Sequence, residues 1–393
     1  MVAIKEAIKK IGNVFASLKD CLLIKALKLA ERIKFQDKRR KKIYNSFSLT
    51  DSQQRATNHY YKTHYGKKVS LKWHKYYASY TRHFDKTFFP ELLYIPELEH
   101  YLNVDENYVK TFADKNVIPF LAAFVGIKTP RVVCSCTSGV YRNGDYRIVP
   151  KEQIIRLIDN KGKFFFKPSV DSDSGRGCCI VEFVNGIDGK SGKTIEDILD
   201  QVQNGWVIQD IVKTSTALSN LSPTSVNTFR IMTYIWKGKI YSVPSILRIG
   251  RAGAFVDNAH AGGIFIGIDD DGSLHEEAFT EFQERFFEHP DTHISFKGYS
   301  IKQFPLVLDA AKRLHELIPQ VGIINWDFTL DENDEPLLIE ANTLKGGIWI
   351  FQMAHGKGPF GDNTEEILEW LRKARKKSYL KRKVLASQIK GKN

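Results

Sequence analysis

The sequence predicts an α+β protein in which strands and helices are mixed. From about residue 131 to residue 365, apolar runs of strand length, such as VVCSC, FFFKP, WVIQDIV and FRIMTYIW, are interspersed with helical segments near 151–159 and 301–318. Several of these strands follow one another through turn residues, which is typical of hairpins and antiparallel sheets. No G-x-G-x-x-G follows a first strand and no G-x-x-x-x-G-K-[ST] occurs, so neither a dinucleotide fold nor a P-loop is indicated.

Size and composition restrict the class of protein further. A hydrophobic content of 42% over 393 residues excludes a disordered chain and allows a sizeable core. The longest apolar run, VIPFLAAFVGI (117–127), is too short to cross a bilayer. The segment MVAIKEAIKK lacks the features of a secretory signal, and the five cysteines have no metal-binding spacing. We therefore expect a cytoplasmic protein with reduced thiols.

The net charge of +13 is concentrated at the two ends of the chain. Residues 1–44 have a net charge of +9 and residues 372–393 one of +10, which leaves −6 for the middle. Residues 3–35 place apolar side chains at helical spacing with lysines between them, and the basic run KRRKK (38–42) follows. The sequence therefore predicts a basic amphipathic helix at one end and a basic tail at the other.

Alternative roles for this helix remain open at the level of sequence. Residues 1–42 could bind the surface of an anionic membrane through apolar burial and the attraction of basic side chains, which would place the protein on the inner face of the membrane. The helix could instead pack on its own protein and expose a solvated basic face. Nucleic acid is a less favoured partner because the body of the protein is acidic.

The chain divides into four segments by composition. Residues 1–44 form the basic helix, and the aromatic, polar residues 45–113 predict a small helical cap. Residues 114–370 contain the mixed strands and helices, and residues 371–393 are the basic tail.

The stretch NWDFTLDENDEPLLIEANT (325–343) predicts a β-hairpin with its turn in DENDE (331–335). A turn centred there places Asp327 opposite Glu340, and Asn342 projects from the same face as Glu340 because side chains alternate along a strand. Oxygen ligands gathered in this way suit a hard cation such as Mg²⁺. From this stretch alone, an exposed acidic hairpin edge explains the pattern equally well.

A second stretch, KFFFKPSVDSDSGRGCCIVEF (163–183), predicts a place for phosphate groups. Its first strand ends in Lys167, whose ammonium can point into a cleft as a single positive charge. The loop that follows contains Ser174, Gly175 and Gly177, and its small residues let backbone N–H groups approach phosphate oxygens closely. Glycine–serine hairpins without a ligand are also common.

The strand WVIQDIV (206–212) could hold an adenine ring between apolar side chains while its backbone bonds the edge of the base, although an ordinary core strand has the same pattern. Arg230 and Arg248 lie in apolar strands, where a guanidinium is costly unless it is paired. The partner could be a protein carboxylate or a bound anion such as phosphate. Asn258 belongs to a glycine-rich loop that could fold over that anion.

Taken in order, these segments resemble the ATP-grasp superfamily, and most closely its sugar-transfer-associated branch, which is related to alpha-L-glutamate ligases. The motifs are DKN…GIKTP, FFFKP with SDSGRG, VIQDIV, NTFRI, LRIGRAG…VDNAHAGG and NWDF…LLIEAN, between about residues 70 and 370. The resemblance implies an ATP-grasp fold, in which two α+β subdomains grip ATP, here with a helical cap and basic amphipathic helices at the ends.

The resemblance also implies roles for individual residues. Lys115 and Lys167 would contact the phosphates of ATP, beneath the mobile loop that contains Ser174, Gly175 and Gly177. The adenine would lie at Gln209, Asp210 and Ile211. Mg²⁺ or Mn²⁺ would be held by Asp327, Glu340 and Asn342. Arg230 and Arg248 would face the γ-phosphate and the acceptor carboxylate, with Asn258 in the loop over them. The segment KTSTALSN departs from the histidine–proline pair expected after VIQDIV in close relatives.

The activity that the resemblance implies is ligation of a carboxylate to an amine through an acyl phosphate, in cell-surface polysaccharide biosynthesis. Metal ions, lysines and arginines would stabilise the charge on the transferring oxygens. Two alternatives remain: phosphoryl transfer to a sugar-type acceptor, and a non-catalytic scaffold whose basic ends dock on a membrane or nucleic acid.

Overall fold

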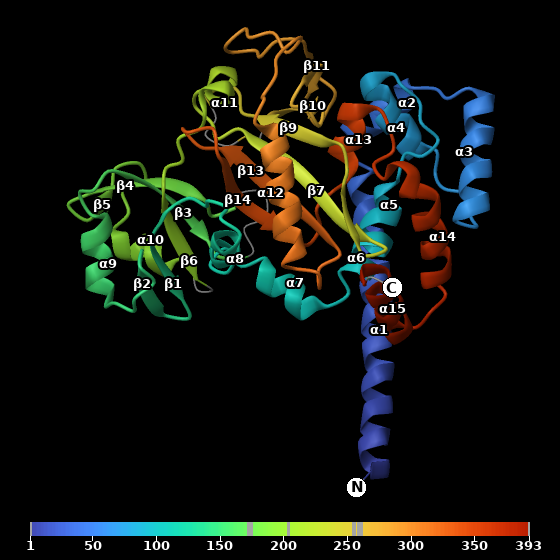
Figure 1. The fold of residues 1–393 in the computed structure, drawn as a ribbon, viewed down its shortest axis with the longest axis horizontal. Coiled ribbons are helices and arrows are strands. Elements are labelled where there is room, and N and C mark those ends of the chain that lie inside the picture. Colours follow the sequence, from blue (N-terminus) through green and yellow to red (C-terminus); the bar gives the residue numbers. More distant parts are fainter. Residues whose placement is uncertain (1, 171–175, 203–204, 254–256, 258–261, 392–393) are drawn as a thin grey trace.

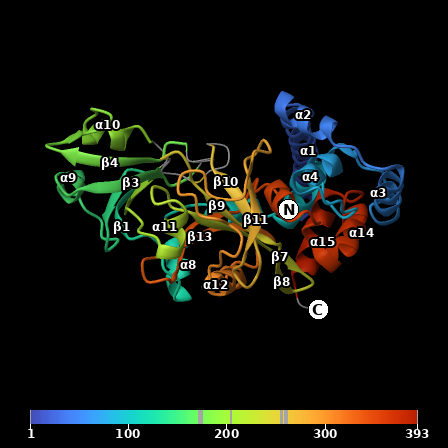
Figure 2. The same ribbon diagram turned by 90° about the horizontal axis from the view of Figure 1, so that it is seen from above.

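The computed structural model describes residues 2–170, 176–202, 205–253, 257 and 262–391, with side chains from residue 11 onward. Within these residues, two antiparallel sheets lie beside a group of helices (Figure 1). In Figure 2 the small sheet and the helices lie on opposite sides of the large sheet. The predicted α+β class is confirmed.

The helices are concentrated in the first third and at the end of the described chain. In the first part they are α1 (Val2–Lys34), α2 (Lys38–Ser46), α3 (Asp51–His64), α4 (Lys72–Thr81), α5 (Glu91–Leu93), the π-helical η1 (Tyr94–Glu99), α6 (His100–Leu102), α7 (Glu106–Phe112) and α8 (Ile118–Phe124). Later they are α9 (Lys151–Ile158), α10 (Ile195–Asp200), α11 (Thr216–Leu221), α12 (Phe304–Glu316), α13 (Trp349–His355), the short η4 (Gly361–Asn363), α14 (Thr364–Ala374) and α15 (Tyr379–Lys390).

The small sheet has the order β2-β1-β6-β3-β4-β5. Its strands are β1 (Val132–Thr137), β2 (Val140–Asn143), β3 (Lys163–Pro168), β4 (Cys179–Val184), β5 (Ile187–Asp188) and β6 (Trp206–Asp210). The large sheet has the order β12-β11-β10-β9-β7-β13-β14, and β8 also pairs with β7. Its strands are β7 (Thr228–Trp236), β8 (Lys239–Ser242), β9 (Ser245–Ile249), β10 (Ile264–Ile268), β11 (Leu274–Phe279), β12 (Arg285–Phe286), β13 (Ile323–Leu330) and β14 (Pro336–Asn342).

Alternation along the strands divides the large sheet into two buried faces. Phe229 and Ile231 of β7 pack in one hydrophobic cluster with α12, whereas Met232 and Tyr234 pack in another with α4, α13 and α14. Because successive side chains point to opposite faces, Arg230 lies on the same face as Met232, away from α12. The helices of residues 35–104 therefore share a core with the large sheet. The segment boundaries at residues 44, 113 and 370 remain a proposal.

The hairpin of β13 and β14 contains a bulge that the sequence pattern does not reveal. Next to the turn, Phe328 pairs with Leu338, but one step further Asp327 pairs with Glu340, so Ile339 is an extra residue on β14. The predicted pairing of Asp327 with Glu340 is confirmed. Because of the extra residue, Leu338 and Ala341 both pack in the α12 cluster. Glu340 consequently takes the face that Asp327 occupies.

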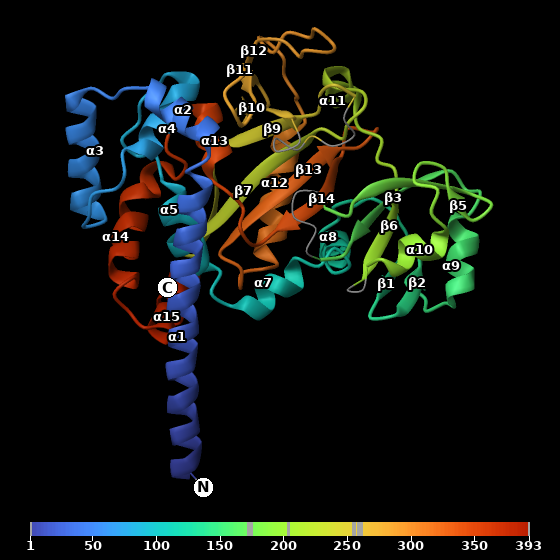
Figure 3. The ribbon, with the colours of Figure 1, turned by 180° about the vertical axis from the view of Figure 1, so that it is seen from behind.

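Helix α1 confirms the helix predicted for residues 3–35. Its N-terminal half extends beyond the rest of the molecule, and its second half lies beside α15 (Figures 1 and 3). The buried Asp20 joins α1 to the body through an ion pair with Arg382 and a 2.7 Å contact with His100 Nε2. Among the described residues, no helix is both long and apolar enough to span a bilayer.

Candidate nucleotide and metal site

Three neighbouring strands of the large sheet place charged side chains in one row. Arg230 on β7 pairs in register with Asp327 on β13, which pairs in register with Glu340 on β14. Directly paired residues of antiparallel strands have side chains about 5 Å apart on the same face. The row therefore presents a cation and two acids on the face that α12 does not cover.

Arg230 and Asp327 form a two-pronged ion pair. Arg230 Nε lies 2.5 Å from Asp327 Oδ1, and Arg230 Nη2 lies 2.9 Å from Asp327 Oδ2. Arg248 Nη2 lies 3.3 Å from the same Oδ2, and Asn342 Nδ2 donates to it at 3.3 Å. Both oxygens of Asp327 are thus occupied by donors from three strands. Of the two kinds of partner expected for these arginines, the structure shows a protein carboxylate, and Asp327 is also a residue predicted to bind the metal.

A second acid, Asp257, completes the cluster around Arg248. Arg248 Nη2 lies 3.5 Å from Asp257 Oδ1 and 2.7 Å from Thr228 Oγ1, and Thr228 donates a hydrogen bond to Asp257. Burial raises the pKa of the Asp257 carboxyl, and Arg248 opposes that shift. Sequence reasoning did not select Asp257 or Thr228, although Asp257 lies in the quoted segment VDNAHAGG, next to the predicted Asn258.

A pocket separates this row from the small sheet. Its empty volume, including the part open to solvent, is about 310 Å³. Four of the predicted site residues line it together: Lys115, Lys167, Gln209 and Glu340. Lys115 precedes α8 and places its Nζ 2.9 Å from Glu340 Oε1. Its backbone N–H donates to Ser169 O, which ties this segment to the end of β3.

Lys167 reaches the pocket from β3 and is buried, with 4% of its surface exposed. Burial lowers the pKa of Lys167 to about 8, while nearby Glu340 opposes the shift and Lys115 adds to it. A buried ammonium with a lowered pKa is stabilised when an anion binds beside it, which favours a role in holding phosphate.

Of the three residues predicted to lie at the adenine, the structure places one at the pocket and pairs another with an arginine. Gln209 lines the pocket, and its Nε2 donates to Pro130 O at 3.4 Å. Asp210 turns its carboxylate to Arg131, with Nε 2.6 Å and Nη2 3.0 Å away, and its backbone N–H donates to Arg131 O. Ile211 is half-buried just after the strand. A direct contact of the Asp210 side chain with a base in the pocket would require this ion pair to open.

Only part of the predicted loops lies within the described residues. Gly177 has a φ of +76°, and a Cβ there would lie 2.9 Å from Pro168 Cγ. Glycine is therefore required at this position, both for its backbone conformation and for its contact with the end of β3. Ser174, Gly175 and Asn258 lie outside the described residues.

The side chains present fit a divalent hard cation. Asp327, Glu340 and Asn342 offer carboxylate and amide oxygens, which are the ligands that Mg²⁺ and Mn²⁺ take in proteins. Asn342 uses its Nδ2 to donate to Asp327, so its amide oxygen is directed elsewhere. A metal that bound Asp327 would have to replace Arg230 at one oxygen, and the row could then offer Arg230 to an anion.

Comparison with known proteins identifies the family. The sugar-transfer associated ATP-grasp family matches residues 96–366, which is more than half of the chain. The chain therefore belongs to this family. No curated protein sequence matches it.

Two of the solved structures to which the chain is similar are described as ligases. The D-alanine–D-alanine ligase of Helicobacter pylori is 15% identical, with 67% of this chain and 58% of that chain covered and a TM-score of 0.36. The L-amino acid ligase of Bacillus licheniformis is 13% identical, with 63% and 44% covered and a TM-score of 0.34. The chain thus spans about half the length of these structures.

Proposed function

We propose that the protein is an ATP- and Mg²⁺-dependent carboxylate–amine ligase that acts in cell-surface polysaccharide or other sugar-transfer biosynthesis. The observation that carries this proposal is the row Arg230–Asp327–Glu340, whose last member lines the same pocket as Lys115 and Lys167. Membership of the ATP-grasp family supports the use of ATP. The sugar-transfer role is supported by the family's description.

In this proposal the charged residues exchange partners when the nucleotide binds. Mg²⁺, held by Asp327, Glu340 and Asn342, would supply positive charge next to the phosphates. Arg230 and Arg248 would leave Asp327 and turn their forked guanidinium groups to the γ-phosphate and the acceptor carboxylate, anions whose geometry they match. Lys115 and Lys167 would neutralise the remaining phosphate charge.

The reaction then proceeds in two balanced steps. An oxygen of the acceptor carboxylate attacks the γ-phosphorus, the bond to the β-phosphate oxygen breaks, and ADP leaves an acyl phosphate behind. The amine nitrogen attacks the acyl carbon, phosphate leaves, and the nitrogen loses a proton to give an amide. Preorganised cations stabilise the negative charge that develops on the transferring oxygens.

Trapping with hydroxylamine tests this reaction class. The protein is incubated with ATP, Mg²⁺, hydroxylamine and a set of carboxylic acids, and we expect an acyl hydroxamate together with ADP. ADP together with a phosphorylated alcohol would instead support phosphoryl transfer to a sugar-type acceptor. Absence of nucleotide turnover with every acceptor would support the scaffold and contradict the ligase.

Two variants of the same hairpin test whether ADP formation depends on the proposed metal site. Glu340→Gln removes a proposed metal ligand, and we expect ADP formation to fall by about a hundredfold or more. Glu332→Gln changes an exposed acid in the turn of the same hairpin, 3.8 Å from the exposed Lys213, and serves as the control. Equal activity of the two variants would contradict the proposed metal site.

We also propose that α1 binds the surface of an anionic membrane. The side of α1 that faces away from the body carries exposed apolar side chains at helical spacing, namely Ile11, Val14, Phe15, Leu18, Leu22, Leu29 and Ile33. The exposed Lys19, Lys25 and Arg32 flank this stripe, whereas the acids of the same region, Asp20 and Glu31, are buried. Among the side chains of α1 that the structure describes, the exposed charged ones are all basic, which favours anionic lipid over a second copy of the same helix.

Sedimentation with vesicles tests this placement. Phe15→Asp and Leu22→Asp change exposed side chains, so they leave the fold intact, and we expect each to reduce binding to vesicles of phosphatidylglycerol and phosphatidylcholine. Val184→Asp, at an exposed position of β4, is the control. Unchanged sedimentation of both α1 variants, or their conversion of a dimer to a monomer, would contradict membrane binding.

A further inference from the structure

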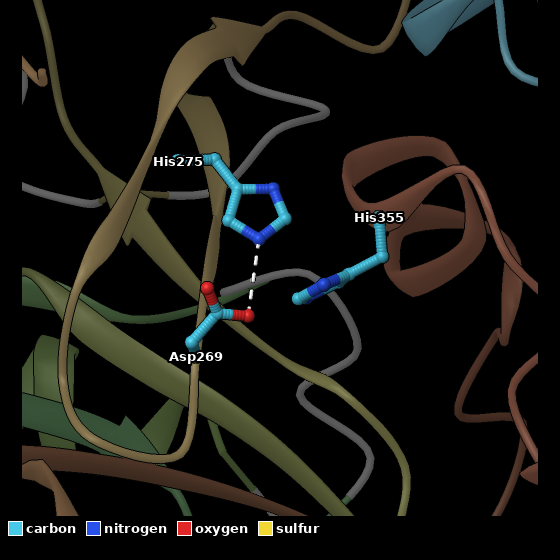
Figure 4. A group of neighbouring side chains, drawn as sticks. All are labelled: Asp269, His275 and His355. Carbon is cyan, nitrogen blue, oxygen red and sulfur yellow. Dashed lines mark hydrogen bonds and ion pairs between the residues drawn. The ribbon is translucent and has the colours of Figure 1, made fainter.

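A second group of ligand-type side chains lies on the large sheet, outside the site described above. Asp269 follows β10, His275 is the second residue of β11, and His355 ends α13. One oxygen or nitrogen atom from each lies within 4.8 Å of the others. Figure 4 shows the three side chains converging from these separate elements, and the two imidazole rings are 4.6 Å apart between centroids.

Each histidine of the group has one ring nitrogen at a backbone carbonyl. His275 Nδ1 lies 3.3 Å from Ala354 O, and His355 Nε2 lies 2.6 Å from Ser245 O. A carbonyl only accepts, so these nitrogens carry the protons, and the other nitrogen of each ring keeps its lone pair. Metal-binding histidines in proteins are commonly oriented by such a bond.

Of the two nitrogens with lone pairs, one has a neighbour within the group and the other has no partner. His275 Nε2 lies 3.3 Å from Asp269 Oδ1. His355 Nδ1 is buried and has no hydrogen-bond partner among the described residues. An unpaired buried polar atom of this kind calls for an explanation, and a bound ion is one of the few available. Burial, and then the neighbouring His275, lower the pKa of His355 to about 4.

The backbone makes room for this arrangement at Gly267. A Cβ at this position of β10 would lie 2.6 Å from His275 Nδ1 and within 3 Å of two other ring atoms. Any other residue would therefore displace the ring of His275. A glycine inside a strand weakens the strand, so its presence is explained by the close approach of this side chain.

We propose that Asp269, His275 and His355 bind a divalent first-row transition ion such as Zn²⁺. Two imidazole nitrogens and one carboxylate oxygen form a ligand set that suits zinc better than the oxygen-only set of the Mg²⁺ site. Ligands of tetrahedral zinc lie about 3.4 Å from one another, so the side chains need to move by only about 1 Å. Asp269 is largely exposed, which leaves a coordination position open to water or a substrate group.

The ion would connect three elements around the nucleotide site. Ser245 O, which orients His355, belongs to β9, and β9 also carries Arg248. The ion would thus fix the end of α13 against the turn between β10 and β11, next to β9, the strand that carries Arg248. This inference does not depend on the proposed ligase activity.

Zinc titration of the metal-stripped full chain tests the site. By calorimetry we expect one equivalent of Zn²⁺ to bind, and by absorbance we expect Co²⁺ to give visible bands typical of nitrogen and oxygen ligands. His355→Ala is expected to weaken Zn²⁺ binding by about a hundredfold and to abolish the Co²⁺ bands. Bound Zn²⁺ should also raise the melting temperature of the wild type but not that of the variant.

Two further variants keep the test decisive if His355→Ala fails to fold. Asp269→Asn changes an exposed ligand and is expected to weaken Zn²⁺ binding by about tenfold or more. His293→Ala removes an exposed histidine that pairs with Glu288, at 2.9 Å, and is expected to bind Zn²⁺ like the wild type. The proposal is overturned if the wild type binds no Zn²⁺ stoichiometrically, or if Asp269→Asn binds it as tightly as His293→Ala.

Discussion

The large and the small sheet both carry buried cations, but the surroundings of these cations differ. On the large sheet, Arg230 and Arg248 are paired with Asp327 and Asp257. On the small sheet, Lys167 is buried deeply enough for its pKa to fall to about 8. Paired arginines stay charged and hold the fold together, whereas a desolvated lysine weakens the fold and is available to a ligand. Substitutions on the two sheets should therefore have opposite effects on stability.

The largest effect is expected from Asp327→Ala. This change leaves Arg230 and Arg248 buried beside one fewer acid, and we expect the free energy of unfolding to fall by about 3–5 kcal/mol. Chemical denaturation measures it, with Glu332→Gln as the control on the same hairpin. A loss no larger than that of the control would mean that the ion pairs of the large sheet contribute little to stability.

The second effect concerns the small sheet, where stability and ATP affinity are expected to respond differently to a substitution. Lys167→Met removes a buried ammonium without leaving an unpaired acid, so we expect the free energy of unfolding to stay the same or to rise. ATP affinity should nevertheless fall by about tenfold to a hundredfold, because a phosphate contact is lost. The two quantities are measured by denaturation and by calorimetry. Lower stability combined with unchanged ATP affinity would contradict the proposed phosphate contact of Lys167 and show that this lysine stabilises the fold.

A pH series sharpens the same contrast. The folded-state pKa of Lys167, about 8, lies below the value of 10.5 for a free lysine, so the native state binds fewer protons between these values. The contribution of this group to stability should therefore rise with pH across that window. ATP affinity should fall by about tenfold per pH unit above pH 8 as the charge is lost. Lys167→Arg, which keeps its charge, should show neither trend.

The last effect is confined to the pH dependence of stability and is expected at Glu99, a buried acid that accepts hydrogen bonds from the backbone N–H groups of Lys345 and Gly346. Burial raises its pKa from 4.5 to about 8, so the native state binds more protons than the unfolded state between these values. Its contribution to stability is present below pH 4.5 and is lost as pH rises through 8. Glu99→Gln should flatten this part of the stability curve. An unchanged curve would show that Glu99 is already ionised in the folded protein.

The sequence predicts the fold and much of the row, because these depend on local patterns. The turn residues of DENDE and the alternation of the flanking runs are enough to pair Asp327 with Glu340. The bulge at Ile339 cannot be predicted in this way, because an extra residue leaves both flanking runs apolar. In this case the bulge and the position of the turn compensate, so the pairing is correct although the hairpin is less regular than expected.

Contacts between residues that are far apart in the chain could not be predicted from the sequence. Arg230 in an apolar strand requires a partner, but whether that partner is a protein carboxylate or a bound anion depends on how β7 and β13 align. Asp269 and His275 are about 80 residues away from His355 in the chain, so no spacing rule relates the three. The stripe on α1 is visible in the sequence, but only the packed structure separates its exposed face from the face held by Asp20.

The central claim is that Mg²⁺ and the phosphates of ATP share the acids and cations of this pocket. The most direct measurement is the affinity for ATP by calorimetry, with and without Mg²⁺, for the wild type and for Glu340→Gln. We predict that Mg²⁺ increases the affinity of the wild type by about tenfold or more and leaves that of the variant nearly unchanged. An equal response to Mg²⁺ in both proteins, or none in the wild type, would contradict the claim.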